Sequence, residues 1–451
     1  MYKEFSVITL GCAKNEVDTE FIIGIMKEAG FEYKEDLESA NIIIINSCAF
    51  LESSVNESID AVLSVSGLKK SAKLKTLVLT GCLVHRYKMD LFKELPEVDI
   101  FLSTEKISKL PSLLKENKKG VIFKNFETFL GDEKLPRVIT KPLSFAYIKI
   151  AEGCNHKCAY CTIPAIKGKL RSRSILSIVK EARKLVNKGV REINLIAQDL
   201  SSYGSDLNDG TNLNLLIDAL HEENFRCKFR VLYLYPTGIN DGLLKRLSTY
   251  DDFCSYIDLP LQHSSESVLK AMLRPVGKFS SKNIVEKIKT KYPQIAIRTT
   301  FIVGFPNESK EDVKDLEEFV SKGYFSSMGV FAYSFEEGSV AFENFPNFKL
   351  DKKRVKKDKK AVEIAWQKTR LKELKALKGK TLKILLEGYH SETDMILVGR
   401  TEFQAPEVDG KVLITEALLD KEDIKFGEFY TVKVKNNIGF DLEACLLSRC
   451  E

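Results

Sequence analysis

Hydrophobic and polar positions follow three different patterns along this chain, one after another. Up to about residue 119, short apolar runs alternate with segments of helical periodicity. From about 140 to 372 a strand followed by a helix recurs, and from about 374 to 442 short strands are separated by polar turns. The pattern therefore predicts three domains, with the bounds 1–119, 140–372 and 374–442.

The apolar runs of the first domain are short, continuous and rich in β-branched residues: FSVITL (5–10), NIIIIN (41–46) and TLVLT (76–80). Strands buried on both faces of a parallel sheet have this character. We therefore expect a small parallel α/β domain at the N-terminus.

The second domain contains six steps of strand and helix. Its predicted strands are AYIKIA, EINLIAQ, FRVLYL, YIDLP, IAIRTTFIV and SMGVFAYS. This repetition predicts a partial or complete β/α barrel, which places its chemistry at the carboxyl ends of the strands.

The third domain reads as a small β-barrel, with strands such as TLKILLEG and FYTVKVK. A lysine-rich segment of helical periodicity, DKKRVKKDKKAVEIAWQKTRLKELKALKGK, connects it to the second domain. This segment is either a solvated linker helix or a phosphate-binding arm, and the first interpretation is the more common for a run of charges.

Composition excludes several classes of protein. The chain has 451 residues, of which 44% are hydrophobic and 29% charged, as in ordinary globular domains. It has no apolar run long enough to span a membrane, and its N-terminus lacks the apolar core of a signal peptide, so we expect a cytoplasmic protein. Ten cysteines are too few for a disulfide scaffold, and a net charge of +6 is weak evidence for a nucleic-acid partner.

Each apolar run of the first domain is followed closely by a cysteine: Cys12 in LGC, Cys48 in NSC and Cys82 in TGC. The carboxyl ends of parallel strands lie along one edge of a sheet, so these three residues should converge in space. One such cysteine alone is more often a small buried apolar residue. Three at the same topological position favour a metal site.

Three further cysteines, Cys154, Cys158 and Cys161, lie close together in AEGCNHKCAYCTIP, just past the first strand of the second domain. A structural zinc site needs four ligands, and His156 is poorly placed to be the fourth. A [4Fe–4S] cluster held by three cysteines keeps one iron open. The spacing therefore favours a cluster that binds another molecule, and a zinc or inert cysteine loop is the alternative.

This loop, with Tyr160 before the last cysteine, resembles the signature of the radical S-adenosylmethionine enzymes. Beyond it, LGCAKNEVDTE, INSCAF, TGCL, EGCNHKCAYCTIPAIKGKLRSR and VGRTEFQAPEVDG resemble the methylthiotransferases of that superfamily over almost the whole chain. The resemblance implies an N-terminal parallel α/β cluster domain, a central radical S-adenosylmethionine partial (β/α) barrel, and a C-terminal antiparallel β-barrel called TRAM. Lys167 departs from the arginine that is usual in the family.

The family's reaction implies two [4Fe–4S] clusters and two molecules of S-adenosyl-L-methionine. Cys154, Cys158 and Cys161 would hold the cluster that reduces the cofactor to a radical source. Cys12, Cys48 and Cys82 would hold the second cluster, which carries the sulfur to be methylated and transferred. A one-electron reductant is also required.

Other residues are candidates by position at the strand ends. Gln198 and Asp199 follow the second strand of the central domain, and Arg298 and Gly304 bracket the fifth. Together with Tyr160 they are predicted to contact the cofactor, although polar residues at strand ends often only cap loops. His263 in PLQHSS is a candidate for substrate contact, and a satisfied loop histidine is its alternative.

Within the family, AQDLSSYG, PLQHSS, RTTFIVGFP and APEVDG resemble the RimO type, which acts on an aspartate β-carbon of small-subunit ribosomal protein S-twelve. The MiaB type, which modifies tRNA, is the alternative, and a non-catalytic metal-binding scaffold on ribosomes or RNA is a second one. Residues 379–451 contain nine Lys and Arg against fourteen Asp and Glu, a net charge of 9 − 14 = −5. That sign favours a basic protein over tRNA, with Glu407 and Asp409 as predicted substrate contacts.

Overall fold

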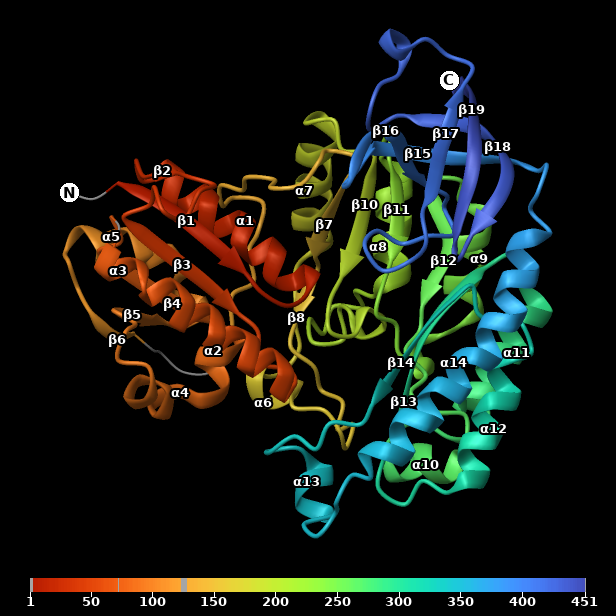
Figure 1. Cartoon of the computed structure of the whole chain (residues 1–451), viewed down its shortest axis with the longest axis horizontal. Helices are drawn as coiled ribbons and strands as arrows, with labels where there is room; N and C mark the ends of the chain where they lie inside the picture. The colour runs from red at the N-terminus through yellow and green to blue at the C-terminus, as the bar shows by residue number, and fades with distance from the viewer. Residues whose placement is uncertain (1–2, 72, 123–127, 451) are drawn as a thin grey trace.

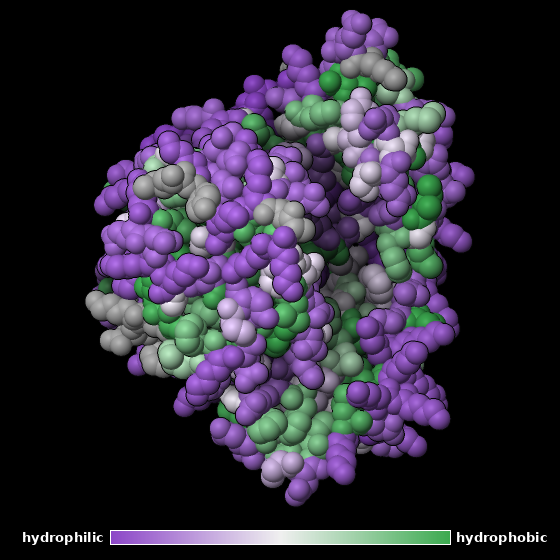
Figure 2. Space-filling view, turned by 60° about the vertical axis from the view of Figure 1, so that its left-hand side comes forward, coloured by the Kyte–Doolittle hydropathy of each residue, from purple (hydrophilic) through white to green (hydrophobic). Residues whose placement is uncertain are grey.

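The computed structural model describes residues 3–71, 73–122 and 128–450. In Figure 1 the N-terminal part lies on the left, a central sheet with its helices lies in the middle, and a β-barrel lies at the upper right. The long helix α14 (Lys352–Lys375) runs down the right side from the barrel. Figure 2 shows the surface hollowed between the N-terminal part and the barrel.

The N-terminal part is a parallel sheet of six strands in the order β2-β1-β3-β4-β5-β6. The three predicted strands are β1 (Glu4–Thr9), β3 (Ile42–Ser47) and β4 (Thr76–Gly81), and they are neighbours. In β3 the side chains from Ile42 to Ile45 are at most 2% exposed, as expected for a strand covered on both faces. The parallel α/β fold predicted for this part is confirmed.

Three shorter strands complete this sheet: β2 (Glu32–Tyr33), β5 (Ile100–Leu102) and β6 (Gly120–Ile122). The last of them pairs with β5 just beyond residue 119, where the sequence suggested that the domain ends. The helices of this part are α1 (Ala13–Glu28), α2 (Glu52–Ser66), α3 (Leu68–Ser71), α4 (Cys82–Glu94) and α5 (Leu110–Lys115).

The central sheet is also parallel and has six strands, ordered as they occur in the sequence. They are β7 (Phe145–Lys149), β10 (Glu192–Ile196), β11 (Lys228–Val231), β12 (Phe253–Asp258), β13 (Ala296–Val303) and β14 (Ser327–Ala332). The first and last strands are not paired with each other, so the sheet is a partial (β/α) barrel. All six predicted strands are present.

Helices follow these strands and cover the sheet: α7 (Ile175–Asn187), α8 (Leu213–Glu222), α9 (Asp241–Thr249), α10 (Glu266–Ala271), α11 (Ser281–Lys291), α12 (Lys310–Val320) and α13 (Val340–Asn344). Short α6 (Ile163–Lys167) lies between the two-residue strands β8 (Ala151–Glu152) and β9 (Arg171–Ser172), which pair with each other. The segment between β8 and α6 is the cysteine loop.

The C-terminal part is a closed barrel in the order β15-β16-β17-β19-β18. Its strands are β15 (Thr381–His390), β16 (Thr393–Arg400), β17 (Val412–Ala417), β18 (Phe429–Ile438) and β19 (Asp441–Arg449). Most neighbours are antiparallel, but β17 and β19 pair in parallel. Strand β19 continues past residue 442, where the sequence suggested the domain ends, because it pairs with both β17 and β18 to close the barrel.

None of the helices in the described part of the chain is both long and apolar enough to span a bilayer.

Candidate active site

The first cysteine triplet lies along one edge of the N-terminal sheet. Cys12 follows β1 and precedes α1, Cys48 follows β3, and Cys82 begins α4 directly after β4. Because β1, β3 and β4 are adjacent and parallel, their carboxyl ends bring the three residues together, as the sequence predicted.

Glycines make this approach possible. Gly11 precedes Cys12 with φ of +94°, and a Cβ at this position would lie 2.7 Å from the Sγ of Cys48. Gly81 precedes Cys82 with φ of +97°, and its Cβ would lie 2.4 Å from the carbonyl oxygen of Ser47. Only glycine combines this backbone conformation with so close an approach.

Polar side chains fix the three turns. The Nδ2 of Asn15 donates to the carbonyl oxygens of Leu10 (2.8 Å) and Ser47 (3.0 Å), which ties the turn after β1 to the one after β3. The Oγ of Ser58 bonds both the amide (3.1 Å) and the carbonyl (2.8 Å) of Cys48. The backbone around the triplet is therefore set before any ligand binds.

The second triplet lies in the loop after β8, at the carboxyl end of the first strand of the central sheet. The amide of Cys154 donates to the carbonyl of Gly168 (3.1 Å), and that of Cys161 to the carbonyl of Cys158 (3.0 Å). The guanidinium of Arg274 lies 3.8 Å from the Sγ of Cys158. This loop therefore has a positive charge beside one of its sulfurs.

His156 lies inside this loop but is engaged elsewhere. Its Nε2 lies 2.7 Å from a carboxylate oxygen of Asp199, and its ring stacks on Tyr235 with centroids 3.7 Å apart. These partners hold the imidazole, which agrees with the expectation that His156 does not complete a zinc site with the three cysteines.

The sulfurs of both triplets lie further apart than three ligands of one metal ion would. Four sulfurs around one zinc ion at 2.3 Å lie about 3.8 Å apart. In neither triplet do the three sulfurs all lie within 4.8 Å of one another, and His221, Asp251 and Asp252 form the one such group of metal-binding side chains among the described residues. In a [4Fe–4S] cluster each cysteine binds a different iron, so wider spacing is required.

Burial also couples these thiols to metal binding. It raises the pKa of Cys82 to about 12, of Cys161 to about 12 and of Cys154 to about 11. Such thiols are protonated at neutral pH when no metal is bound, even with Lys167 and Arg274 nearby. Bound iron would supply the positive charge that stabilises the thiolates, so cluster binding would release protons.

A cluster of buried charges lies between the two triplets. The ammonium of Lys149 on β7 pairs with Asp18 on α1 and with Glu152 on β8 (2.7 Å), and Glu152 also pairs with Lys167 on α6 (3.1 Å). These four side chains are at most 4% exposed. The cluster therefore joins the N-terminal domain to the central domain at the level of both cysteine sites.

The electrostatic balance in this buried cluster favours the charged forms of Glu152 and Lys167, whereas burial raises the pKa of Asp18. Burial alone would raise the pKa of Glu152, but Lys149 and Lys167 outweigh it and lower this pKa to about 2. Burial alone would lower the pKa of Lys167, but Cys82, Glu152 and Asp18 raise it well above its ordinary value. Lys167 thus places a positive charge beside the N-terminal triplet.

Comparison with known proteins agrees with this architecture. Residues 4–103 match the "Uncharacterized protein family UPF0004", residues 148–320 the radical SAM superfamily, and residues 379–446 the TRAM domain. Ribosomal protein uS12 methylthiotransferase RimO of Pelobacter propionicus is 37% identical over 98% of this chain and 97% of its own length. The RimO proteins of Geotalea uraniireducens and Syntrophotalea carbinolica are each 39% identical over 98% of this chain and 97% and 96% of theirs.

The chain belongs to the RimO family of radical SAM methylthiotransferases. Membership makes it an enzyme rather than a scaffold, with S-adenosyl-L-methionine and [4Fe–4S] clusters as cofactors. Among solved structures, the methyltransferase TsrM of Kitasatospora setae, with cobalamin and a [4Fe–4S] cluster bound, superimposes with a TM-score of 0.53 at 12% identity, over 74% of this chain and 72% of TsrM. This likeness shows a shared fold.

Two of the residues predicted to contact the cofactor in this RimO-family chain, Gln198 and Asp199, lie against the loop of the second triplet. Gln198 accepts from the amide of Gly153 (2.9 Å) and donates to Glu152 (2.9 Å), so it connects the cysteine loop to the buried charges. Asp199 accepts from the amide of Ser201 (2.9 Å) besides its contact with His156. The side chains of Gln198 and Asp199 are therefore both held by internal partners. Their contact with the cofactor stays a prediction.

Three further candidates lie elsewhere in the central domain, Arg298 within β13, Gly304 directly after it and Tyr160 in the cysteine loop. Arg298 pairs with Asp258 at 2.8 Å. Gly304, with φ of +87°, donates its amide to Glu308 (2.7 Å), and a Cβ there would lie 2.4 Å from Val355. Tyr160 is half-buried, and burial raises its pKa well above the ordinary value. Their roles toward the cofactor likewise stay predictions.

Two of the candidate substrate contacts, His263 and Asp409, are buried in the fold. His263 is fully buried, its Nδ1 accepts from the amide of Ser265 (3.0 Å), and its Nε2 lies 3.3 Å from Glu308. The side chain of Asp409 is 3% exposed and accepts from the hydroxyl of Tyr256 at 2.7 Å. Both side chains are buried against internal partners, but the Nε2 of His263 and the Oδ1 of Asp409 have no hydrogen-bond partner among the described residues. Their contact with a substrate stays a prediction.

Glu407 differs, because its side chain is 45% exposed. It pairs with Lys141 and accepts from the hydroxyl of Tyr147 at 2.9 Å. Its carboxylate therefore docks the barrel on the central domain, and any contact with a substrate stays a prediction.

Sequence reasoning missed Asp18, Lys149 and Glu152. The signal available was Lys149 in the otherwise apolar strand FAYIK, followed three residues later by Glu152. Charged residues at the buried end of a strand need partners of opposite charge, so this pattern indicates a buried ion-pair site.

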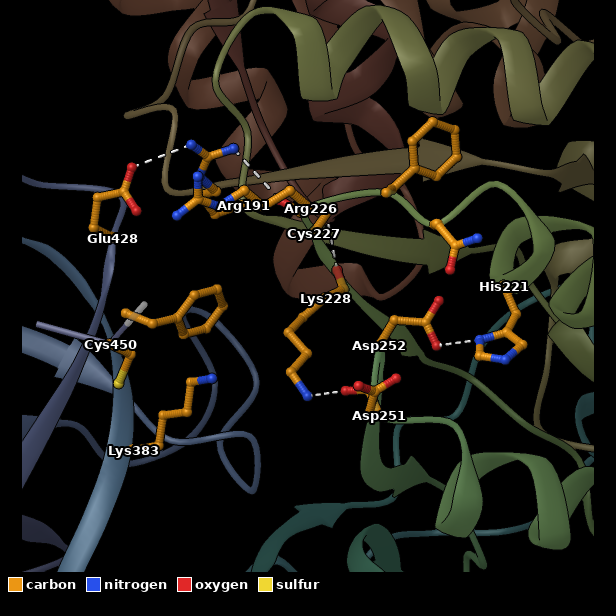
Figure 3. Close-up of a pocket in the computed structure, with 13 residues that line it drawn as sticks. Arg191, His221, Arg226, Cys227, Lys228, Asp251, Asp252, Lys383, Glu428 and Cys450 are labelled. Atoms are coloured by element: carbon orange, nitrogen blue, oxygen red, sulfur yellow. Dashed lines mark hydrogen bonds and ion pairs between the residues drawn. The ribbon is translucent and has the colours of Figure 1, made fainter.

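A different hollow, of about 370 Å³, lies between the barrel and the central domain (Figure 3). Its lining includes Arg191 and Asp252, which directly precede β10 and β12, and Lys228, which begins β11. It therefore lies at the amino ends of the strands, opposite the cysteine loop. In folds of this type the chemistry occurs at the carboxyl ends, so we do not assign the reaction to this hollow.

Proposed function

We propose that this chain methylthiolates the β-carbon of an aspartate in ribosomal protein uS12, the S-twelve protein of the small subunit. The observation that carries the proposal is the pair of three-cysteine sites at the carboxyl ends of two adjoining parallel sheets. The RimO name of the relatives favours a protein substrate over the tRNA of the MiaB alternative. We further propose the cytoplasm as the location and an external one-electron reductant as a partner.

Cys154, Cys158 and Cys161 would hold one [4Fe–4S] cluster, and Cys12, Cys48 and Cys82 the other. When bound, these groups supply one-electron reduction of S-adenosylmethionine and an attachment point for the transferred sulfur. The three domains would divide the work: residues 1–119 hold the sulfur-carrying site, residues 140–372 the radical site, and residues 374–442 the substrate.

The chain's own residues would position and isolate these sites. The four buried charges from Asp18 to Lys167 would hold the two domains together at a point shielded from solvent. Arg274 and Lys167 each place a positive charge beside a cysteine site, where it offsets the negative charge of thiolates. Tyr160, Gln198, Asp199, Arg298 and Gly304 would orient S-adenosylmethionine at the mouth of the partial barrel.

Variants of single cysteines separate the two roles. Cys158→Ala should abolish reductive cleavage of S-adenosylmethionine, which is measured as 5′-deoxyadenosine formed under anaerobic conditions with dithionite. Cys48→Ala should keep this cleavage and lose methylthio transfer to uS12. Cys254→Ala, at a buried thiol outside both triplets, is the control and should keep both activities. Methylthiolated product from the Cys48 variant would refute the assignment of the N-terminal site.

A further inference from the structure

Helix α14 concentrates the positive charge of the molecule. Its residues include eleven Lys and Arg against three Asp and Glu, a net charge of 11 − 3 = +8. The whole chain carries +6, so all the remaining residues together carry 6 − 8 = −2. The excess of basic residues in this protein is therefore a property of one helix.

The acidic residues of α14 are all paired within the helix. Asp358 pairs with Arg354 (3.1 Å), Glu363 with Lys359 (3.7 Å) and Glu373 with Arg370 (3.1 Å). The other eight basic residues are lysines, every one of them is exposed, and none has an ion-pair partner among the residues that the structure describes. Their charges are thus available to an external partner.

The helix presents these lysines on a rigid support. Val355, Val362, Trp366 and Leu374 are at most 8% exposed and face the core, and the indole of Trp366 donates to the carbonyl of Phe325 (2.9 Å). Twenty-four residues give a length of about 36 Å. Lys353, Lys357 and Lys360 are spaced i, i+4 and i+7, which puts them on one outward face.

The chemistry of this surface indicates a phosphate-rich polymer. Exposed lysines neutralise backbone phosphates as point charges, without sequence preference. An anionic membrane fits less well, because a helix that binds a bilayer buries its apolar face in lipid, and the apolar face of α14 is already packed against the protein. The neighbouring barrel, with a net charge of −5, has the opposite sign and suits a basic protein.

We propose that α14 is a contact surface for the phosphate backbone of RNA, and that this RNA is the ribosomal RNA beside the substrate protein. The second statement rests on the proposed function. A partner made of a basic protein and RNA would be complementary to both charged parts of this enzyme. The basic protein would face the acidic barrel, and the RNA phosphates would face the basic helix. The enzyme would then act on uS12 within the small subunit faster than on the free protein.

Binding of RNA tests the surface without catalysis. The probe is a fluorescently labelled single-stranded RNA, measured by anisotropy over a range of salt concentrations. The triple variant Lys353→Gln, Lys357→Gln and Lys360→Gln should bind at least tenfold more weakly at low salt. Its plot of log affinity against log salt should be shallower by about 2, from about 0.7 for each phosphate contact. Glutamine keeps the helix propensity of lysine.

A matched control removes the same charge elsewhere. Lys93, Lys109 and Lys115 are exposed lysines of the N-terminal domain without ion-pair partners in the described chain. Their triple change to glutamine should leave RNA binding within about twofold of the unmodified protein, because these lysines lie outside the proposed surface and make no phosphate contact there. Equal losses in both triple variants, or binding of anionic vesicles but not of RNA, would overturn the proposal.

Catalysis separates this inference from the proposed function. The α14 variant should modify free uS12 at the unmodified rate and lose most of its preference for uS12 within isolated small subunits. Equal rates of the variant and the unmodified enzyme on subunits would overturn the role of α14 alone. No modification of either substrate by the unmodified enzyme would instead refute the proposed function, while the RNA-binding result would still stand for the surface.

Discussion

At the scale of single residues, the sequence located the cysteines but not their surroundings. Cys12, Cys48 and Cys82 could be predicted to converge because each follows an apolar run of one parallel sheet. The buried pair of Lys149 with Asp18 could not, because its partners come from different domains, 131 positions apart. Burial of a charge depends on such tertiary contacts, which no local pattern records.

One residue-scale prediction concerns Gly11. Gly11→Ala should prevent Cys48 from taking its place, because the new Cβ would lie 2.7 Å from its sulfur. Anaerobically reconstituted protein should then fall from about eight irons and eight sulfides per chain to about four of each, from one remaining [4Fe–4S] cluster. Iron and acid-labile sulfide analyses measure both.

Gly30→Ala is the matched control, because Gly30 has a similar φ of +88° with nothing within 4 Å of a new Cβ. Each change costs about 1–2 kcal/mol of backbone strain, but only the first creates a clash. About eight irons in the Gly11 variant would show that the close approach to Cys48 does not matter for the N-terminal cluster.

At the scale of elements, periodicity predicted the long strands and missed the short ones. All six strands of the central sheet were predicted, because each is a clear apolar run followed by a helix. The missed strands β2, β5 and β6 have two or three residues, and only pairing with a neighbour defines them. The parallel pairing of β17 with β19 likewise depends on closure of the barrel rather than on local sequence.

Glu192 at the start of β10 joins two elements of the central sheet to the barrel. It lies 3.2 Å from Arg230 on β11 and 3.2 Å from Arg400 on β16. Burial alone would raise its pKa, but the two arginines outweigh it and lower the pKa to about 2 from an ordinary 4.5. A lowered folded-state pKa stabilises the protein above the ordinary value, and the stabilisation is lost as pH falls toward 2.

Glu192→Gln should therefore lower the urea midpoint at pH 7, with a cost of about 3–5 kcal/mol for leaving two buried arginines without their carboxylate. The variant should also lack the part of the pH dependence between pH 4.5 and 2 that Glu192 contributes. Glu422→Gln, at an exposed carboxylate, should change neither property. Parallel pH profiles for the Glu192 variant and the unmodified protein would refute this role for the interface.

At the scale of the whole molecule, charge is divided between parts in a way that the net value hides. The whole chain has a net charge of +6, residues 379–451 with the barrel have a net charge of −5, and helix α14 has a net charge of +8. The sequence already suggested the acidic barrel, but Asp409, one of the residues chosen to represent it, is buried at the junction with the central domain. The sign of a domain can thus be read from composition, whereas the face on which each charge lies requires the fold.

The most direct test of the central claim is the product itself. Anaerobically reconstituted enzyme, S-adenosylmethionine, sulfide and dithionite are incubated with uS12 or with tRNA, and peptides and nucleosides are analysed by mass spectrometry. The account predicts one aspartate-containing peptide of uS12 heavier by a methylthio group in place of hydrogen, and unchanged tRNA. Unmodified uS12 together with methylthiolated adenosine in tRNA would contradict it.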